Sequence, residues 1–188
     1  MSRLKPFKDV SEHEILGLFA YNGSTASAGT FVKVAGATKG VALNDNLALD
    51  ANAGGAFTNA VSPHFNLPAR VTTVGTGERA IGMLLYDVAL TDENGEQYKF
   101  HPDKAAADNI VLTGQAAPIA KRGIFAVKIN GDPVIGSPVY TDANGYATPT
   151  GEGNGKDVVG IFLGPGDSDG YALCQINTPN FADRNLGA

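Results

Sequence analysis

Short runs of strand-forming residues, each ended by a turn built from aspartate, asparagine and glycine, are the feature that most restricts the fold of this chain. The segment GSPVYTDANGYATP (136–149) is the clearest case. Asp142 can accept hydrogen bonds from the backbone of the turn, and Asn144 and Gly145 tolerate the positive φ that a tight reversal requires. The segment therefore predicts a β-hairpin. Related turns stand in LDANAGGAFT (49–58) and TDENGEQYKF (91–100).

These short strand-forming runs separated by turns predict a mainly β protein that forms an antiparallel β-barrel or sandwich. The chain has 188 residues, of which 43% are hydrophobic, and this is enough for a packed core. Its 24 glycines and 10 prolines are scattered without a period, which fits many short strands and turns. We expect an N-terminal arm at 1–14, a β domain at 15–178 and a C-terminal tail at 179–188. The β domain could divide into two small lobes, at 29–90 and 120–177.

Individual strands follow from the alternation of side chains. GTFVKVAG (29–36) alternates with the period of two that a half-buried strand shows. ARVTTVG (69–75) and RAIGMLLYDVALT (79–91) are joined by TGE, so the sequence predicts a hairpin there. The second of these runs is apolar on both faces and predicts a central strand. QYKF (97–100) predicts a short strand, and HPDKAAADN (101–109) predicts the single short helix.

The last third of the chain predicts four or five strands. RGIFAVKI (122–129) places Phe125, Val127 and Ile129 on one face. VVGIFLG (158–164) and YALCQI (171–176) follow the hairpin. The glycine-rich GEGNGKD (151–157), which lies between the hairpin and VVGIFLG, resembles a phosphate-binding loop only in part, because threonine and aspartate stand where that motif needs glycine and a hydroxyl. A hairpin loop is the better interpretation.

A weak echo links the two halves of the chain. LDANAGGAFT precedes AIGMLLYDV, which contains Gly82, and TDANGYATPT precedes VVGIFLGPG, which contains Gly160. The echo has two explanations: an ancient duplication with an insertion in the first copy, or the repeated use of residues that suit β proteins. The unequal spacing slightly favours the second explanation.

Charge and hydropathy exclude two classes of partner. The net charge is −5 and charged residues make up 18% of the chain, so we expect no nucleic-acid partner, since phosphates call for clustered lysine and arginine. No apolar run approaches the roughly 18 residues of a membrane span, so we expect no membrane association. Residues 1–28 share some features of an export signal, but Asp9, Glu12 and Glu14 argue against that interpretation.

A search for chemistry finds no convincing motif, so we expect no enzyme, no catalytic residue, no metal and no cofactor. No nucleophile elbow or paired-histidine zinc motif occurs. The DANG and DSDG turns lack the glutamate that completes a calcium loop. Cys174 is the only cysteine and lies in an apolar run, which predicts a core position. The enzymatic alternative would need dispersed residues, for instance Ser62 or Cys174 with His64.

The order of strand types over residues 131–177, and more loosely over 29–90, resembles that of tailed-bacteriophage head decoration proteins, also called capsid cement proteins. The resemblance lies in GDPVIGSPVYTDANGYATPT followed by KDVVGIFLGPGDSDGYALCQI. It implies a viral structural protein of the virion that is made in the host cytoplasm, binds the outer capsid surface and bridges neighbouring capsomers. The implied partners are the major capsid protein and further copies of the chain, often in a trimer.

The resemblance also implies that a terminal arm holds a neighbouring subunit. In this chain the arm would use Phe7 as an apolar anchor, with Arg3, Lys5 and Lys8 contacting an acidic capsid surface. The alternative function is a phage fibre or surface adhesin module that recognises carbohydrate or a receptor. The absence of tryptophan and the 8% aromatic content weaken that alternative, because sugars commonly stack on exposed aromatic rings.

Overall fold

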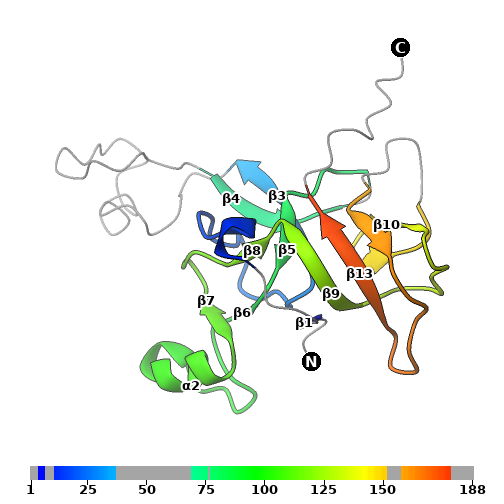
Figure 1. Ribbon diagram of the computed structural model, residues 1–188. Coiled ribbons are helices and arrows are strands. Elements are labelled where there is room, and N and C mark those ends of the chain that lie inside the picture. Colours follow the sequence, from blue (N-terminus) through cyan, green and yellow to red (C-terminus); the bar gives the residue numbers. More distant parts are fainter. Residues whose placement is uncertain (1–3, 7–10, 37–68, 76, 152–157, 179–188) are drawn as a thin grey trace.

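The computed structural model describes residues 4–6, 11–36, 69–75, 77–151 and 158–178. In this part of the chain the protein is mainly β, with sheets of six, five and two strands and one short α-helix (Figure 1). All strand pairs of the two larger sheets are antiparallel, and the two sheets pack as a sandwich rather than closing into a barrel. The predicted fold class is confirmed. Residues 37–68, 152–157 and 179–188 lie outside the described part of the chain. The predictions on Ser62, His64, the turn at 49–58 and the C-terminal tail therefore concern residues outside it.

The six-stranded sheet has the order β1-β9-β13-β12-β10-β11. Its strands are β1 (Leu4–Pro6), β9 (Arg122–Lys128), β10 (Pro138–Thr141), β11 (Ala147–Thr148), β12 (Gly160–Phe162) and β13 (Tyr171–Asn177). The five-stranded sheet has the order β2-β8-β5-β3-β4. Its strands are β2 (Ile15–Leu16), β3 (Phe31–Gly36), β4 (Ala69–Thr73), β5 (Gly82–Leu84) and β8 (Ile119–Ala120).

Residues 85–118 form an excursion from the five-stranded sheet. It contains the only parallel pair among the described strands, β6 (Asp87–Ala89) with β7 (Ile110–Leu112). Between them lie the 3₁₀ turn η2 (Tyr98–Phe100) and helix α2 (Pro102–Ala107), and a second 3₁₀ turn, η1 (Glu12–Glu14), precedes β2. The predicted helix is confirmed, with proline in its first turn. No helix of the described residues is long and apolar enough to cross a membrane.

The two larger sheets repeat one strand order. We call β2, β3, β4, β5 and β8 the first unit, and β9, β10, β11, β12 and β13 the second unit. In both units the strands lie side by side in the order first, fifth, fourth, second, third. Their backbone hydrogen bonds correspond as well: Gly29 N–H donates to Leu84 O at 2.7 Å, and Gly136 N–H donates to Phe162 O at 2.8 Å. Both of these glycines have a positive φ, of 88° and 82°.

The glycines of the sequence echo occupy the same place in the two units. Gly82 begins β5 opposite Val32, and Gly160 begins β12 opposite Val139. A Cβ on Gly82 would lie 2.6 Å from the carbonyl oxygen of Ala120, and a Cβ on Gly160 would lie 2.1 Å from that of Gln175. Shared strand order and shared close contacts support the duplication.

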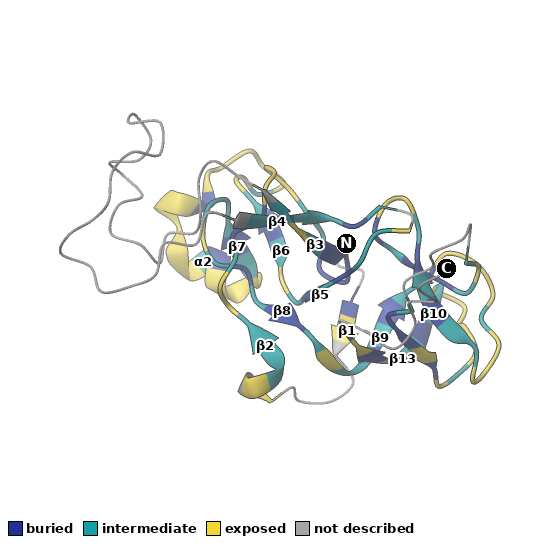
Figure 2. Cartoon of the chain, turned by 90° about the horizontal axis from the view of Figure 1, so that it is seen from above, coloured by how far each residue is buried: buried dark blue, intermediate teal, exposed yellow. Residues whose placement is uncertain are grey.

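The main core lies between the two sheets. From the first unit it contains Phe31, Met83 and Ala120, which sit directly opposite one another across β3, β5 and β8. From the second unit it contains the inward side chains of β9, β10, β12 and β13, among them Phe125, Val127, Ile129, Val139, Phe162 and Cys174. The predicted common face of Phe125, Val127 and Ile129 is therefore confirmed. Residues of both possible lobes contribute to this core cluster. Figure 2 shows buried stretches, in dark blue, in both larger sheets.

The other face of the five-stranded sheet is also buried. Val32, Leu84 and Ile119 lie on it and pack with Tyr21, and with Val88 and Val111 from the excursion. When the two units are aligned, the face that the first unit turns toward the core corresponds to the outward face of the second unit. The two units therefore stack through faces that are not equivalent in the repeat. Burial on both faces makes β5 the central strand that the sequence predicts.

Three local predictions are wrong. β4 and β5 do not form a hairpin, because β3 lies between them and pairs with both. The 79–91 run is two strands, since the chain leaves the sheet after Leu84 and continues as β6. QYKF forms a 3₁₀ turn in which Tyr98 is buried and donates from its hydroxyl to Asp108 Oδ2 at 3.0 Å. The same crossing occurs in the second unit, where β10 separates β11 from β12. Of the predicted loop GEGNGKD, only Gly151 belongs to the described residues.

Candidate functional site

Three turns with the same hydrogen bonds hold the ends of the strands. In DENGE, DANGY and DSDGY the first aspartate accepts two backbone N–H groups, those two and four residues on, through Oδ1. For Asp142 both distances are 2.8 Å. The glycine of each turn has a positive φ between 72° and 85°. This is a type I turn followed by a glycine bulge, as expected for a three-residue hairpin connection.

The hairpin at Asp142 joins the two sheets as well as two strands. Phe31 N–H donates to Gly145 O at 2.8 Å, so the turn contacts the beginning of β3 in the five-stranded sheet. A Cβ on Gly145 would lie 2.7 Å from Thr73 and 2.8 Å from the carbonyl oxygen of Phe31. The turn therefore needs glycine for its φ of 72° and for the close approach. The predicted hairpin and the role of Asp142 are confirmed.

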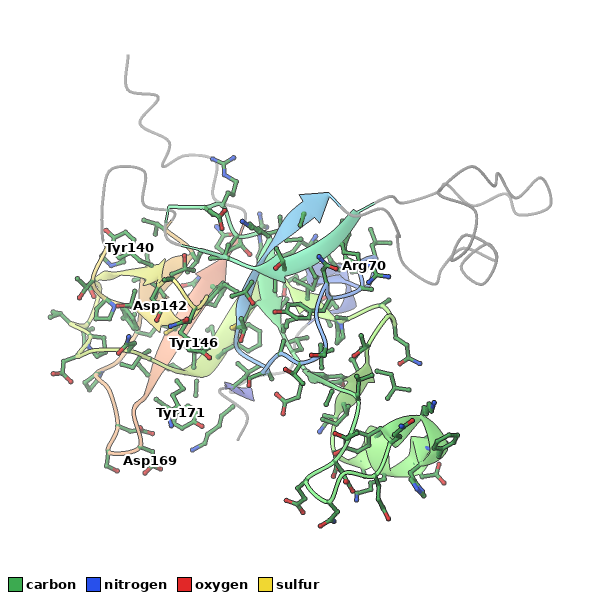
Figure 3. The ribbon with its side chains drawn as sticks, turned by 180° about the vertical axis from the view of Figure 1, so that it is seen from behind. Arg70, Tyr140, Asp142, Tyr146, Asp169 and Tyr171 are labelled. Carbon is green, nitrogen blue, oxygen red and sulfur yellow. The ribbon has the colours of Figure 1, made fainter. Side chains whose placement is uncertain are left out.

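The expected arm is partly a strand. Leu4–Pro6 pair with Phe125–Val127 of β9, and Leu4 is buried in the main core. The outward side chain of Lys5 lies with its Nζ 4.2 Å from the centre of the Tyr171 ring, and Lys128 Nζ lies 5.8 Å from the same ring. Figure 3 shows Tyr171 beside Asp169 at the end of the β12–β13 connection. Arg3, Phe7 and Lys8 lie outside the described residues.

An exposed apolar patch lies on the outward side of the six-stranded sheet. We call it the outer patch and define it as Val134, Ile135, Ile161 and Leu163, which are 70%, 65%, 49% and 39% exposed. Ile161 and Leu163 alternate with the buried Phe162, so they point away from the core. Val134 and Ile135 lie in the turn that hydrogen-bonds to β12 through Gly136.

The internal repeat shows that the outer patch is unusual for this fold. Met83 of the first unit stands where Ile161 stands in the second, and Met83 is fully buried against the other sheet. The corresponding pair Ala28 and Ile135 differs in the same way, with 3% and 65% exposed. Contiguous exposed apolar side chains on a folded protein commonly mark an interaction surface. The sequence placed partner contacts on the arm and missed this patch.

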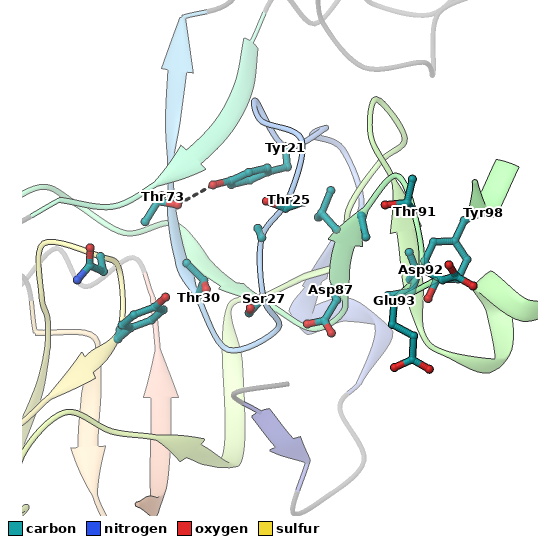
Figure 4. Close-up of a pocket in the computed structure, with 16 residues that line it drawn as sticks. Tyr21, Thr25, Ser27, Thr30, Thr73, Asp87, Thr91, Asp92, Glu93 and Tyr98 are labelled. Carbon is teal, nitrogen blue, oxygen red and sulfur yellow. Dashed lines mark hydrogen bonds between the residues drawn. The ribbon is translucent and has the colours of Figure 1, made fainter. Parts of the chain in front are cut away.

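Two polar clefts flank the turn of the β10–β11 hairpin. The larger has a volume of about 550 Å³ and lies between this turn, the 21–30 segment and β6 (Figure 4). The smaller has a volume of about 430 Å³ and lies between the same turn and Asn130–Gly131. Asn144 lines both clefts. Most side chains around them carry hydroxyl, amide or carboxylate groups, and they are described further below.

In the described part of the chain, the arrangement of metal-binding side chains and the environment of the single cysteine bear on possible chemistry. No three His, Cys, Asp or Glu side chains are close enough there to hold a metal ion. Cys174 is fully buried, as predicted, and burial raises the pKa of its thiol to about 12. A thiol with that pKa is protonated at neutral pH and is a poor nucleophile. The enzymatic alternative built on Cys174 is therefore disfavoured by the environment of the thiol itself.

Comparisons with family models, with curated proteins and with solved structures found no match to this chain.

Proposed function

We propose that the protein is a tailed-bacteriophage head decoration protein, which binds the outer surface of the capsid and bridges neighbouring capsomers. The observation that carries the proposal is the outer patch. It is formed by residues of the same segment, 131–177, whose strand order resembles that of decoration proteins. The corresponding face of the first unit is covered by a sheet, so the fold provides an apolar face that a partner can cover.

Two lysines on the outward face of the same sheet suit contact with carboxylates of a partner. Lys5 and Lys128 lie on the outward face near Tyr171, at the β1–β9 side of the sheet. Charged groups at the rim of an apolar contact steer association and fix its orientation more than they add affinity. A capsid surface with carboxylates around an apolar depression would therefore be complementary. Lys5 keeps the partner-contact role assigned from the sequence, although its own strand is part of the β domain.

The rest of the molecule suits a bracing role. The outer patch is held between strands whose connections are fixed by the aspartate turns, so little conformational entropy is lost when it binds. A trimer would present three copies of the patch and gain through effective concentration, so modest single contacts would give long residence. Occupancy of the outer capsid surface needs no catalytic residue and no cofactor.

Co-sedimentation with empty heads tests the proposal. The proposal requires a major capsid protein gene near the gene of this chain, and the heads are assembled from that capsid protein. Ile161→Asp places a carboxylate in the outer patch, and Leu90→Asp is its matched control, because both side chains are 49% exposed and Leu90 lies in the excursion. We expect Ile161→Asp to lower occupancy at least tenfold and Leu90→Asp to leave it unchanged. Wild-type protein that does not sediment with heads, or equal occupancy of both variants, would refute the proposal.

The arm requires a separate test. Deleting residues 2–10 would remove β1 and the buried Leu4, so lost occupancy could then reflect instability. The triple variant Arg3→Ala, Phe7→Ala, Lys8→Ala keeps Leu4–Pro6 in place. We expect it to bind heads more weakly while its melting temperature stays that of the wild type. Full occupancy of the triple variant would reject the arm as a capsid contact.

A further inference from the structure

The two clefts beside the β10–β11 turn form one polar track. The turn separates them, and Asn144, at its third position, lines both. The larger cleft, of about 550 Å³, falls within the range of small-molecule sites. The smaller one continues past Asp142 to Thr148 and Thr150. A ligand longer than one small molecule can therefore pass over the turn and contact both sides.

The side chains along the track offer hydroxyl, carboxylate and amide groups. In the larger cleft Tyr21 and Thr73 form a hydroxyl pair at 2.7 Å, and Figure 4 shows Ser27, Thr30 and Asp87 below them. The smaller cleft adds an asparagine, an aspartate and three threonines. No lysine, arginine or histidine is among the described residues that line either cleft. The track therefore has no fixed positive charge to hold a phosphate, a nucleic acid or an acidic glycan.

Three carboxylates of the track already accept hydrogen bonds within the protein. Asp92 forms an ion pair with Lys104, and its Oδ1 accepts two backbone N–H groups. Asp87 Oδ1 accepts the Ala28 N–H at 2.6 Å, and Asp142 Oδ1 accepts two backbone N–H groups of its own turn. These carboxylates can still accept a hydrogen bond through remaining lone pairs, which suits a hydroxyl donor. A carboxylate that accepts backbone N–H groups keeps its charge, so these groups and Glu93 repel acidic ligands while they accept hydrogen bonds from hydroxyl groups.

We propose that this track binds a neutral saccharide chain, with Asn144 as the residue that contacts it on both sides of the turn. Saccharide hydroxyls both donate and accept, and they match clefts lined mostly by side chains with hydroxyl, amide and carboxylate groups. Such binding is independent of capsid decoration, and it would let a decorated particle adhere to a glycan-bearing surface. The track lies at the junction of the two sheets and uses none of the residues of the outer patch.

Calorimetric titration of the full-length protein with defined hexasaccharides tests the proposal. The probes are maltohexaose, cellohexaose and the matched pair of N-acetylglucosamine and glucosamine hexamers, which share one backbone and differ in charge below pH 6. We expect saturable binding of at least one neutral hexamer. No binding of any neutral hexamer would overturn the proposal. Tighter binding of the cationic hexamer than of its acetylated form would also overturn it, because the site would then select positive charge.

Variants locate the site. Asn144→Ala removes the shared amide from an exposed position, and we expect it to weaken binding about fivefold to tenfold, the equivalent of one or two hydrogen bonds. Asn144→Lys places a long cationic side chain across both clefts and should weaken binding further. Asp169→Ala is the control, because Asp169 is exposed at the same position of a turn with the same hydrogen bonds and lines neither cleft. Equal affinity of Asn144→Ala and Asp169→Ala would refute this location.

Discussion

Replacing Gly160 by alanine tests the packing that the two units share. The new Cβ would lie 2.1 Å from the carbonyl oxygen of Gln175 and 3.2 Å from the Cα of Ile176, and both of these atoms belong to the backbone of β13. An ordinary contact needs at least 3.4 Å, so β12 and β13 must separate by more than 1 Å. No side chain can rotate to relieve this contact, because the obstacle is the neighbouring strand itself.

Two opposing effects determine how much Gly160→Ala changes the free energy of unfolding. Alanine restricts the unfolded chain more than glycine does, which favours the variant by up to about 1 kcal/mol. Against this, overpacking a rigid core costs about 1–3 kcal/mol, and stretching hydrogen bonds such as Leu163 N–H to Leu173 O, 2.8 Å long, adds about 1 kcal/mol each. The clash dominates, so we expect a net loss of about 3 kcal/mol in the free energy of unfolding. For a chain of this size that lowers the melting temperature by about 6–12 °C.

Urea unfolding followed by circular dichroism measures the loss, with Gly164→Ala as the matched control. Gly164 lies two residues beyond β12, and a Cβ there would meet only the Cβ of Leu173, at 3.9 Å, an ordinary contact. Gly82→Ala should behave like Gly160→Ala, since its Cβ would lie 2.6 Å from the carbonyl oxygen of Ala120. A Gly160→Ala protein within about 1 kcal/mol of Gly164→Ala would refute the reasoning.

Three further predictions follow from the turns and from the buried thiol. Asp142→Ala removes the acceptor of two backbone N–H groups and should cost about 1–2 kcal/mol of unfolding free energy, whereas Asp142→Asn should cost less because the amide oxygen still accepts; equal losses in urea titrations would contradict this role. The hydrogen bond from Lys104 lowers the pKa of Asp92 from its ordinary value of 3.8, so the stabilisation is complete above that value and is lost as the pH falls through the lower folded pKa. Acid titrations should therefore show a smaller loss of stability below pH 3.8 in Asp92→Asn than in the wild type, and identical curves would disprove the coupling. The Cys174 thiol, with a pKa of about 12, should resist iodoacetamide at pH 8 in the folded protein and react once urea unfolds it; rapid labelling of native protein would show that the thiol is not buried.

The sequence predicted the elements whose signals are local. The hairpin at Asp142 was identified because three residues of its turn each have a specific conformational role, and helix α2 because alanines follow a proline. The strand at Phe125 was identified from a clean alternation. These features depend on neighbours in the chain, so a single sequence is enough to recognise them.

The pairing of strands depended on distant residues and was missed. TGE between two β-forming runs looks like a hairpin connection. In the structure, however, β4 pairs with one edge of β3 and β5 pairs with the other edge, so the TGE connection crosses β3. Tyr98 favours a strand by its side chain, yet its burial with a hydrogen bond to Asp108 selects a 3₁₀ turn. The outer patch could not be predicted for the same reason. Ile161 and Phe162 are both apolar in the sequence, and only the sheet packing shows that Phe162 is buried and Ile161 exposed.

The stacking of unlike faces has a consequence for assembly. Two units joined in this head-to-tail manner leave one apolar face at each end, and such contacts can in principle continue from molecule to molecule into a fibre. Here the excursion of residues 85–118 covers the end that belongs to the first unit, through Val88 and Val111. Within the described residues, a second molecule therefore does not expose the face of the first unit that would pair with the outer patch. The excursion thus blocks head-to-tail association at this end of the molecule.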